Sequence, residues 1–142
     1  MTAIYPHTDK IKELLKDKSE LVQQKGLNYL IPNWQQFADL YAESEELIYE
    51  WLNDLDTRKI IDEILQILPY QERIKIELVL KPIDKKVIDK TFEINECVWG
   101  DNVEIQKYDK QKNWYYYRMN QKVFDSEAGQ FTKYFPDESP PG

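Results

Sequence analysis

Few side chains in this sequence are of the types that usually carry out chemistry. The chain has 142 residues, with one histidine, His7, and one cysteine, Cys97. A single cysteine excludes an internal disulfide, and the two residues together are too few for the usual zinc cages. His7 follows Pro6 near the start of the chain, where a general base would be hard to hold in position, and no histidine or lysine stands beside Cys97 to activate its thiol.

The other candidates for catalysis are equally isolated. None of the four serines stands in a nucleophile-elbow sequence, and the four glycines form no phosphate-binding loop. Four acids flank a turn and could bind a cation or act as an acid–base pair, but their spacing matches no known motif: Glu93, Glu96, Asp101 and Glu104. We therefore expect a protein without enzymatic activity, without a cofactor and without a metal site.

The most informative feature is a run of acidic residues in the first half. Residues 39–56 contain seven acidic side chains and no lysine or arginine, in a chain whose net charge is −7. On one helix over 34–55, spacings of 4, 3, 4 and 4 place five of these acids within an arc of roughly 80°. Tyr49 lies at the edge of this acidic stripe. The predicted partner-binding residues are Asp39, Glu43, Glu46, Tyr49, Glu50 and Asp54.

Two interpretations of the acidic stripe remain open. Runs of like charge are most often solvated outer faces that keep a protein soluble. Alternatively, the stripe docks onto a cationic surface, because carboxylates can occupy a basic cleft much as phosphates do and can speed association. Both depend on one uninterrupted helix, whereas Ser44 could instead cap a second, shorter helix.

The spacing of apolar residues divides the chain into two halves, and the elements in these halves must position the residues described above. The first half has helical spacing. We expect Thr8 to cap the first helix and Gly26 to stop it, Pro32 to interrupt the chain, Thr57 to cap the last helix and Pro69 to end it.

The second half switches to a period of two. Residues 73–81 place Ile74, Ile76, Leu78 and Leu80 on one side and mostly charged residues on the other, which predicts a half-buried strand. We expect Pro82 to Lys86 to form a turn. Further turns then separate strands expected at 92–98, 103–105 and 114–119, with a short hairpin of 122–124 and 131–135.

These patterns predict an α+β fold in a single domain spanning residues 1–135. About three N-terminal helices, in a helical half at 8–69, would pack on one face of a C-terminal antiparallel β-meander of four to five strands at 72–135. Residues 136–142 have the composition of a flexible tail. Because neither a signal peptide nor a long apolar run is visible, we expect a cytoplasmic protein that does not enter a membrane.

Small size, acidity and the missing catalytic groups favour a non-enzymatic protein-binding module. Its most concrete form is an acidic inhibitor or immunity-type protein, monomeric until it neutralises a basic toxin or nuclease. One alternative is a single-stranded nucleic-acid-binding module that uses the aromatic and basic strand 107–122, in which Trp114–Tyr117 would stack on bases, although the net charge disfavours nucleic acid. A second is a structural or assembly subunit that associates with itself.

Overall fold

The computed structural model describes residues 5–94, 98 and 109–126, and most of these residues are helical. The α-helices among them are α1 (Asp9–Leu14), α2 (Glu20–Lys25), α3 (Leu27–Gln36), α4 (Ile48–Ile67), α5 (Tyr70–Lys90) and α7 (Gln121–Ser126). The remaining described elements are a π-helical turn η1 (Phe37–Tyr41), a 3₁₀ turn η3 (Trp114–Tyr117) and two short strands, β1 (Phe92–Glu93) and β2 (Arg118–Met119).

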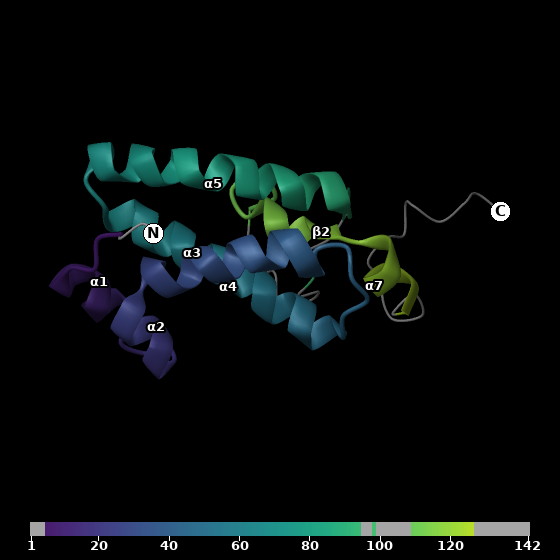
Figure 1. The fold of residues 1–142 in the computed structure, drawn as a ribbon, viewed down its shortest axis with the longest axis horizontal. Helices are drawn as coiled ribbons and strands as arrows, with labels where there is room; N and C mark the ends of the chain where they lie inside the picture. The colour runs from purple at the N-terminus through teal and green to yellow at the C-terminus, as the bar shows by residue number, and fades with distance from the viewer. Residues whose placement is uncertain (1–4, 95–97, 99–108, 127–142) are drawn as a thin grey trace.

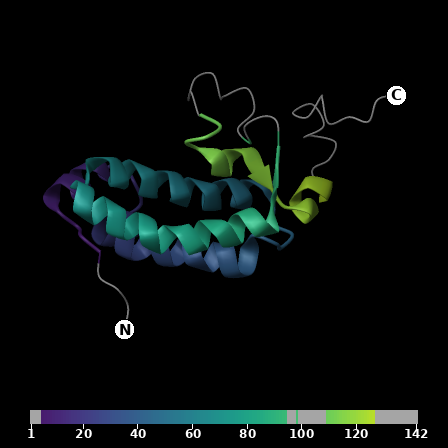
Figure 2. The same cartoon turned by 90° about the horizontal axis from the view of Figure 1, so that it is seen from above.

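The three longest helices form the body of the molecule. α3, α4 and α5 run side by side, with α1 and α2 at one end and α7 at the other (Figure 1). The segment that contains η3 and β2 covers one side of this layer (Figure 2). At the centre, Phe37 packs between Trp34 and Trp51, with 5.1 Å between ring centroids in both pairs, and all three rings are buried. The core is therefore made chiefly by facing helices.

Local signals explain where the first helices begin and end. The Thr8 hydroxyl accepts a hydrogen bond from the Ile11 amide at 3.3 Å, and Gly26, at φ +54°, ends α2 in a conformation that glycine tolerates best. The cap at Thr8 and the stop at Gly26 are confirmed, whereas the single helix expected between them is wrong. The structure places two helices between them because Ser19 caps a new one, accepting from the Val22 amide at 3.4 Å. Pro69 follows the end of α4, also as predicted.

The predicted α+β fold with a four-to-five-stranded meander is wrong. Residues 73–81, expected as a strand, lie inside α5. The buried side chains of this helix are Ile76, Leu80, Ile83 and Val87, at spacings of 4, 3 and 4. The alternating pattern also included Leu78, which the helix leaves 65% exposed. An alternating pattern over nine residues thus concealed a helix of 21 residues, whose buried stripe runs from Ile76 to Val87.

Three expected interruptions are also absent from the helices. Pro32 lies inside α3, Pro82 lies inside α5, and Thr57 lies inside α4 rather than at its start. A proline removes one hydrogen bond to the carbonyl four residues earlier. For Pro82 that carbonyl belongs to the exposed Leu78, so water can satisfy it and the helix continues.

The sheet within the described residues is a single antiparallel pair. Phe92 lies opposite Met119, and Glu93 lies opposite Arg118. Residues 114–117 form η3 rather than a strand, and residues 122–124 belong to α7. The strands predicted at 103–105 and 131–135 and the tail at 136–142 lie outside the described residues. Among the helices described, none combines the length and the apolar character that crossing a membrane requires.

The joint between α2 and α3 predicts a specific sensitivity to substitution. A Cβ atom at Gly26 would lie 2.5 Å from Nδ1 of His7, and the positive φ would be strained as well. We expect Gly26→Ala to lower the free energy of unfolding by about 1–3 kcal/mol in urea denaturation. The matched control is Gln24→Ala, at an exposed position two residues earlier. Equal stability of the two variants would contradict this account.

Candidate functional site

The acidic stripe is broken near its middle. α3 is followed directly by the π-helical turn η1, which contains Asp39. The Ala42 amide donates to the Phe37 carbonyl at the end of this turn, and α4 begins only at Ile48. The Ser44 hydroxyl donates to the Leu40 carbonyl at 2.6 Å within the connector between them. The single helix predicted over 34–55 is therefore wrong, and its five acids do not share one face.

Asn120 fixes the course of this connector. Its side-chain amide donates to the carbonyls of Ala42 at 2.9 Å and Ser44 at 2.8 Å. Asn120 itself is 2% exposed, and its Oδ1 accepts from the Val123 amide at 2.7 Å. A buried side chain from the C-terminal part of the chain thus sets the position of residues 42–47.

Lysines of α5 lie near the first two acids of the stripe but hold them to different degrees. Asp39 accepts from Lys86 at 2.7 Å and from Gln35 at 3.0 Å, and these bonds hold the pKa of Asp39 below its ordinary value. Glu43 is 3.8 Å from Lys90, although its side chain stays 64% exposed. The charge of Asp39 is therefore largely used within the molecule, while Glu43 remains available to a partner.

The start of α4 brings three of the other predicted acids together. Glu46, Glu50 and Asp54 interact there, and Oε2 of Glu46 is buried without a hydrogen-bond partner among the described residues. Burial, together with the neighbouring charges of Asp54 and Glu50, raises the pKa of Glu46 to about 8. Burial also raises the pKa of Asp54. These two half-buried carboxyls therefore interact with each other.

Glu50 and Tyr49 lie on the outside of the same turn. Glu50 Oε1 accepts from the Leu47 amide at 3.2 Å, which satisfies one of the free N–H groups at the start of α4. The side chain of Tyr49 is 61% exposed, the exposure expected of a contact residue. Of the six predicted residues, Asp39, Glu43, Tyr49 and Glu50 are exposed, and within the described residues Asp39 is the one of these four whose charge is held closely by a lysine.

These residues belong to a surface that sequence reasoning did not define. Large apolar side chains are exposed along the same stretch: Leu40 at 55%, Tyr41 at 40%, Leu47 at 55% and Tyr49 at 61%. The acids Glu43, Glu45 and Glu50 are exposed between them. We call these seven residues, which lie on η1, the connector and the first turn of α4, the connector surface (Figure 1).

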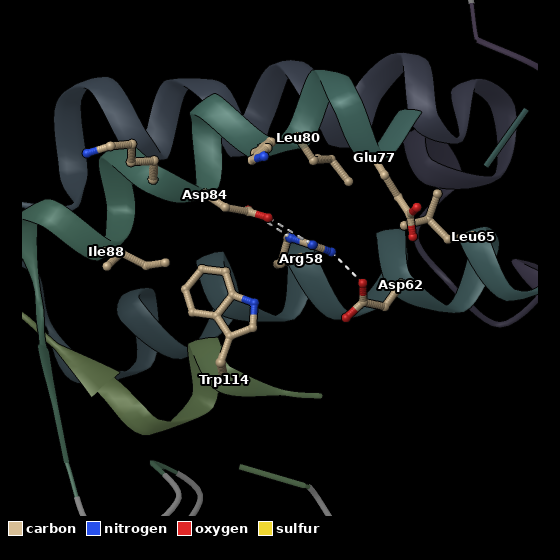
Figure 3. A pocket seen from close by; sticks show the side chains of 10 residues that line it. Arg58, Asp62, Leu65, Glu77, Leu80, Asp84, Ile88 and Trp114 are labelled. Carbon is tan, nitrogen blue, oxygen red and sulfur yellow. Dashed lines mark hydrogen bonds and ion pairs between the residues drawn. The ribbon is translucent and has the colours of Figure 1, made fainter. Parts of the chain in front are cut away.

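A second site, absent from the sequence prediction, centres on Arg58 of α4. Its guanidinium bonds to both oxygens of Asp84 on α5, at 3.0 Å each, and to Asp62 one turn along α4 (Figure 3). Burial opposes its charge, but Asp84 and Asp62 outweigh that effect and hold the pKa of Arg58 above its ordinary value. Arg58 is only 7% exposed, so this is a buried ion cluster.

Two aromatic residues complete the Arg58 cluster. The Trp34 indole donates to Asp84 Oδ1 at 2.8 Å, and the Tyr115 hydroxyl donates to Asp62 Oδ2 at 2.7 Å. Burial and the charge of Asp62 raise the pKa of Tyr115 above its ordinary value, so Tyr115 stays a donor. The sequence held one signal for this cluster, the Arg58–Asp62 spacing of four, but it offered no means of placing Asp84 beside them.

A cavity of about 540 Å³ opens over this cluster, between α4 and α5. Its apolar walls come from Leu65, Leu80, Ile88 and Trp114, and its polar lining includes Arg58, Asp62, Glu77, Lys81, Asp84 and Lys85 (Figure 3). The volume lies within the range of small-molecule sites, which are mostly apolar with a few placed polar groups. The cavity could hold a ligand, whereas the charged groups of the Arg58 cluster beneath it are bonded to one another.

Three of the four aromatic residues predicted to stack on bases are turned inward, and the fourth, Trp114, is partly buried. Tyr115 and Tyr116 are fully buried and Tyr117 is 8% exposed. The Tyr116 hydroxyl donates to Asp56, which ties η3 to α4. These rings pack between the helices and the sheet, so they present no exposed platform for single-stranded nucleic acid. Lys107, at the start of the predicted basic strand, lies outside the described residues.

The remaining chemical candidates form no centre in the part of the chain that the structure describes. His7 Nε2 lies 2.8 Å from the Gln23 carbonyl, a contact between the N-terminal segment and α2. Cys97, Glu96, Asp101 and Glu104 lie outside the described residues, within which no group of three metal-ligating side chains is present. Comparison with family models, curated proteins and solved structures found no match to this chain.

The acids at the start of α4 predict a pH-dependent stability. Because the pKa of Glu46 is about 8 when folded and near 4.5 when unfolded, the folded chain binds more protons between these values. The free energy of unfolding should therefore fall as pH rises from 5 to 8, by about 1–2 kcal/mol after allowance for the partial exposure of Glu46. Urea denaturation across this range should show a flatter profile for Glu46→Gln, and an unchanged one for the exposed Glu45→Gln. A flat profile in the native chain would refute the assignment.

The Arg58 cluster predicts a large loss of stability when its cation is removed. Arg58→Met leaves the two carboxylates of Asp62 and Asp84 without their buried counter-charge, at an expected cost of about 3–5 kcal/mol. Chemical denaturation would measure it, with Lys85→Ala as the control. Lys85 pairs with Asp89 on the exposed face of α5, so its removal should change stability by less than about 0.5 kcal/mol. Similar values for the two variants would contradict the structural role of the cluster.

Proposed function

We propose that this chain is a non-enzymatic protein-binding module, an acidic inhibitor of the immunity type that docks on a basic protein such as a toxin or nuclease. The observation that carries the proposal is the connector surface, where four large apolar side chains are 40–61% exposed among acidic ones. Exposed aromatic and apolar groups close together are typical of contact surfaces rather than of surfaces kept only for solubility.

The charge of the connector surface specifies the kind of partner. Glu43, Glu45 and Glu50 are exposed there, and no lysine or arginine occurs between residues 39 and 56. Lys90 approaches Glu43 only at 3.8 Å, which leaves most of its carboxylate in solvent. A positively charged partner would therefore be attracted, and tyrosine and leucine side chains would supply the contact area once it arrives.

A hollow next to the connector surface also suits a protein partner. It has a volume of about 330 Å³, and its lining includes Tyr41, Tyr29 and Asp54. A basic side chain of the partner could enter this hollow between an aromatic ring and a carboxyl group. Asp54 would contribute through this hollow, whereas Asp39 and Glu46 contribute less to docking, because Asp39 pairs with Lys86 and Glu46 interacts with Asp54.

The proposal is tested by isolating the partner and then measuring association with purified proteins. A tagged chain is recovered from its native host, and the protein bound to it is identified by mass spectrometry and purified. We expect Glu43→Lys combined with Glu45→Lys to slow association at least about tenfold at low salt, with a smaller effect at high salt. Tyr49→Ala should mainly speed dissociation.

The matched control carries the same change of charge elsewhere. Glu13→Lys combined with Asp17→Lys alters exposed acids in and beyond α1, at the other end of the helical layer (Figure 1). This variant should associate at close to the native rate. Equal effects of the two double variants, or a bound protein without a basic surface, would refute the docking role. A defined oligomer of the purified chain alone would favour the assembly-subunit alternative instead.

A further inference from the structure

We propose that the cavity between α4 and α5 binds a small amphipathic molecule, an aromatic carboxylate or sulfonate with its ring between the apolar walls and its anionic group toward Lys81. This site is separate from the connector surface, and it does not depend on the function proposed above. The inference rests on which polar groups around the cavity already have partners and which do not.

Each aspartate oxygen on the floor of the cavity already accepts at least one hydrogen bond. Both oxygens of Asp84 accept from Arg58, and Oδ1 also accepts from Trp34. Asp62 accepts from Arg58 through one oxygen and from Tyr115 through the other. Glu77 is the exception in the lining, and it is an exposed residue at the Leu65 end, away from Trp114 (Figure 3). A ligand that offers donors would find little to bind on the floor.

The groups left over near the floor are donors. A guanidinium has five N–H groups, and Arg58 uses three of them in its bonds to the two aspartates. The Trp114 indole N–H has no hydrogen-bond partner within the described residues, and its ring lies below Arg58 in Figure 3. A ligand placed here must therefore supply acceptor atoms, as a carboxylate or sulfonate does.

Lys81 indicates that the ligand's acceptor group is anionic. It lines the cavity one helical turn beyond Glu77, is exposed, and forms no ion pair within the described residues. The other lysine of the lining, Lys85, is held by Asp89 at 2.8 Å. Lys81 is thus the cation of the lining that remains available to an anionic group, and the positively charged ammonium favours a carboxylate over a neutral carbonyl.

The apolar walls define the rest of the ligand. Leu80 and Leu65 are almost fully buried at the back, whereas Ile88 is 41% exposed at the mouth and Trp114 is partly buried. An aromatic body would cover Ile88 and lie against the Trp114 ring, removing both from water. A cavity of about 540 Å³ accommodates two or three fused or linked rings.

Two fluorescent probes test the ligand class on the full chain. Anilinonaphthalene sulfonate carries an anionic group, and N-phenyl-1-naphthylamine has the same ring system without it. We expect saturable binding of the sulfonate with one site per chain. Lys81→Ala should weaken the sulfonate about 3- to 10-fold and leave the affinity for the neutral probe unchanged. Equal weakening of both probes, or of neither, would overturn the assignment of the anionic group.

Two substitutions on α5 test the location. Ile88→Asp should weaken both probes more than tenfold, because it places a charge at the apolar mouth. Leu78→Asp, at a 65% exposed position outside the cavity lining, should change neither affinity. Near-ultraviolet circular dichroism checks that packing is retained, and Ile88→Ser replaces Ile88→Asp if it is not. Equal affinities of the Ile88 and Leu78 variants, or more than one probe per chain, would overturn the site.

Discussion

The arrangement of the helices depends on one buried cation shared by two carboxylates. Arg58 joins Asp62 on its own helix to Asp84 on α5, while Trp34 from α3 and Tyr115 from η3 complete the bonds of the two aspartates. Burying three charges is costly unless each has its partners, so misplacing any of these four segments leaves an uncompensated group. The apolar core holds the helices together, and this cluster restricts how far they can slide past one another.

The parts of the fold that could be predicted from the sequence are those decided by neighbouring residues. Thr8, Gly26 and Pro69 act through a capping hydroxyl, a positive φ and a missing N–H, and each effect is confined to about one turn. The stretch at 73–81 was different, because alternating apolar residues fit a strand as well as part of a helix. The residues that distinguish the helix from a strand are Ile83 and Val87, because they continue the helical stripe beyond Pro82. Treating Pro82 as a turn removed them from consideration.

In the candidate site too, features set by neighbouring residues could be predicted, and features set by contacts far along the chain could not. The acidic run is visible in the sequence, and exposure of Glu43, Tyr49 and Glu50 agrees with a contact role. The break at residues 42–47 is fixed by Asn120, and Asp39 is paired with Lys86, so both depend on residues far along the chain. The Arg58 cluster depends on Asp84 in the same way. Local patterns could not predict contacts across 26 to 78 residues.

The dependence of the connector on Asn120 has a consequence for the order of events during synthesis. α3, α4 and α5 all precede Thr91 in the chain, so most of the helical body can assemble once Lys90 has emerged from the ribosome. The carbonyls of Ala42 and Ser44 receive their amide partner only after another thirty residues have been added. A nascent chain would therefore form these helices before the connector between η1 and α4 takes its final course.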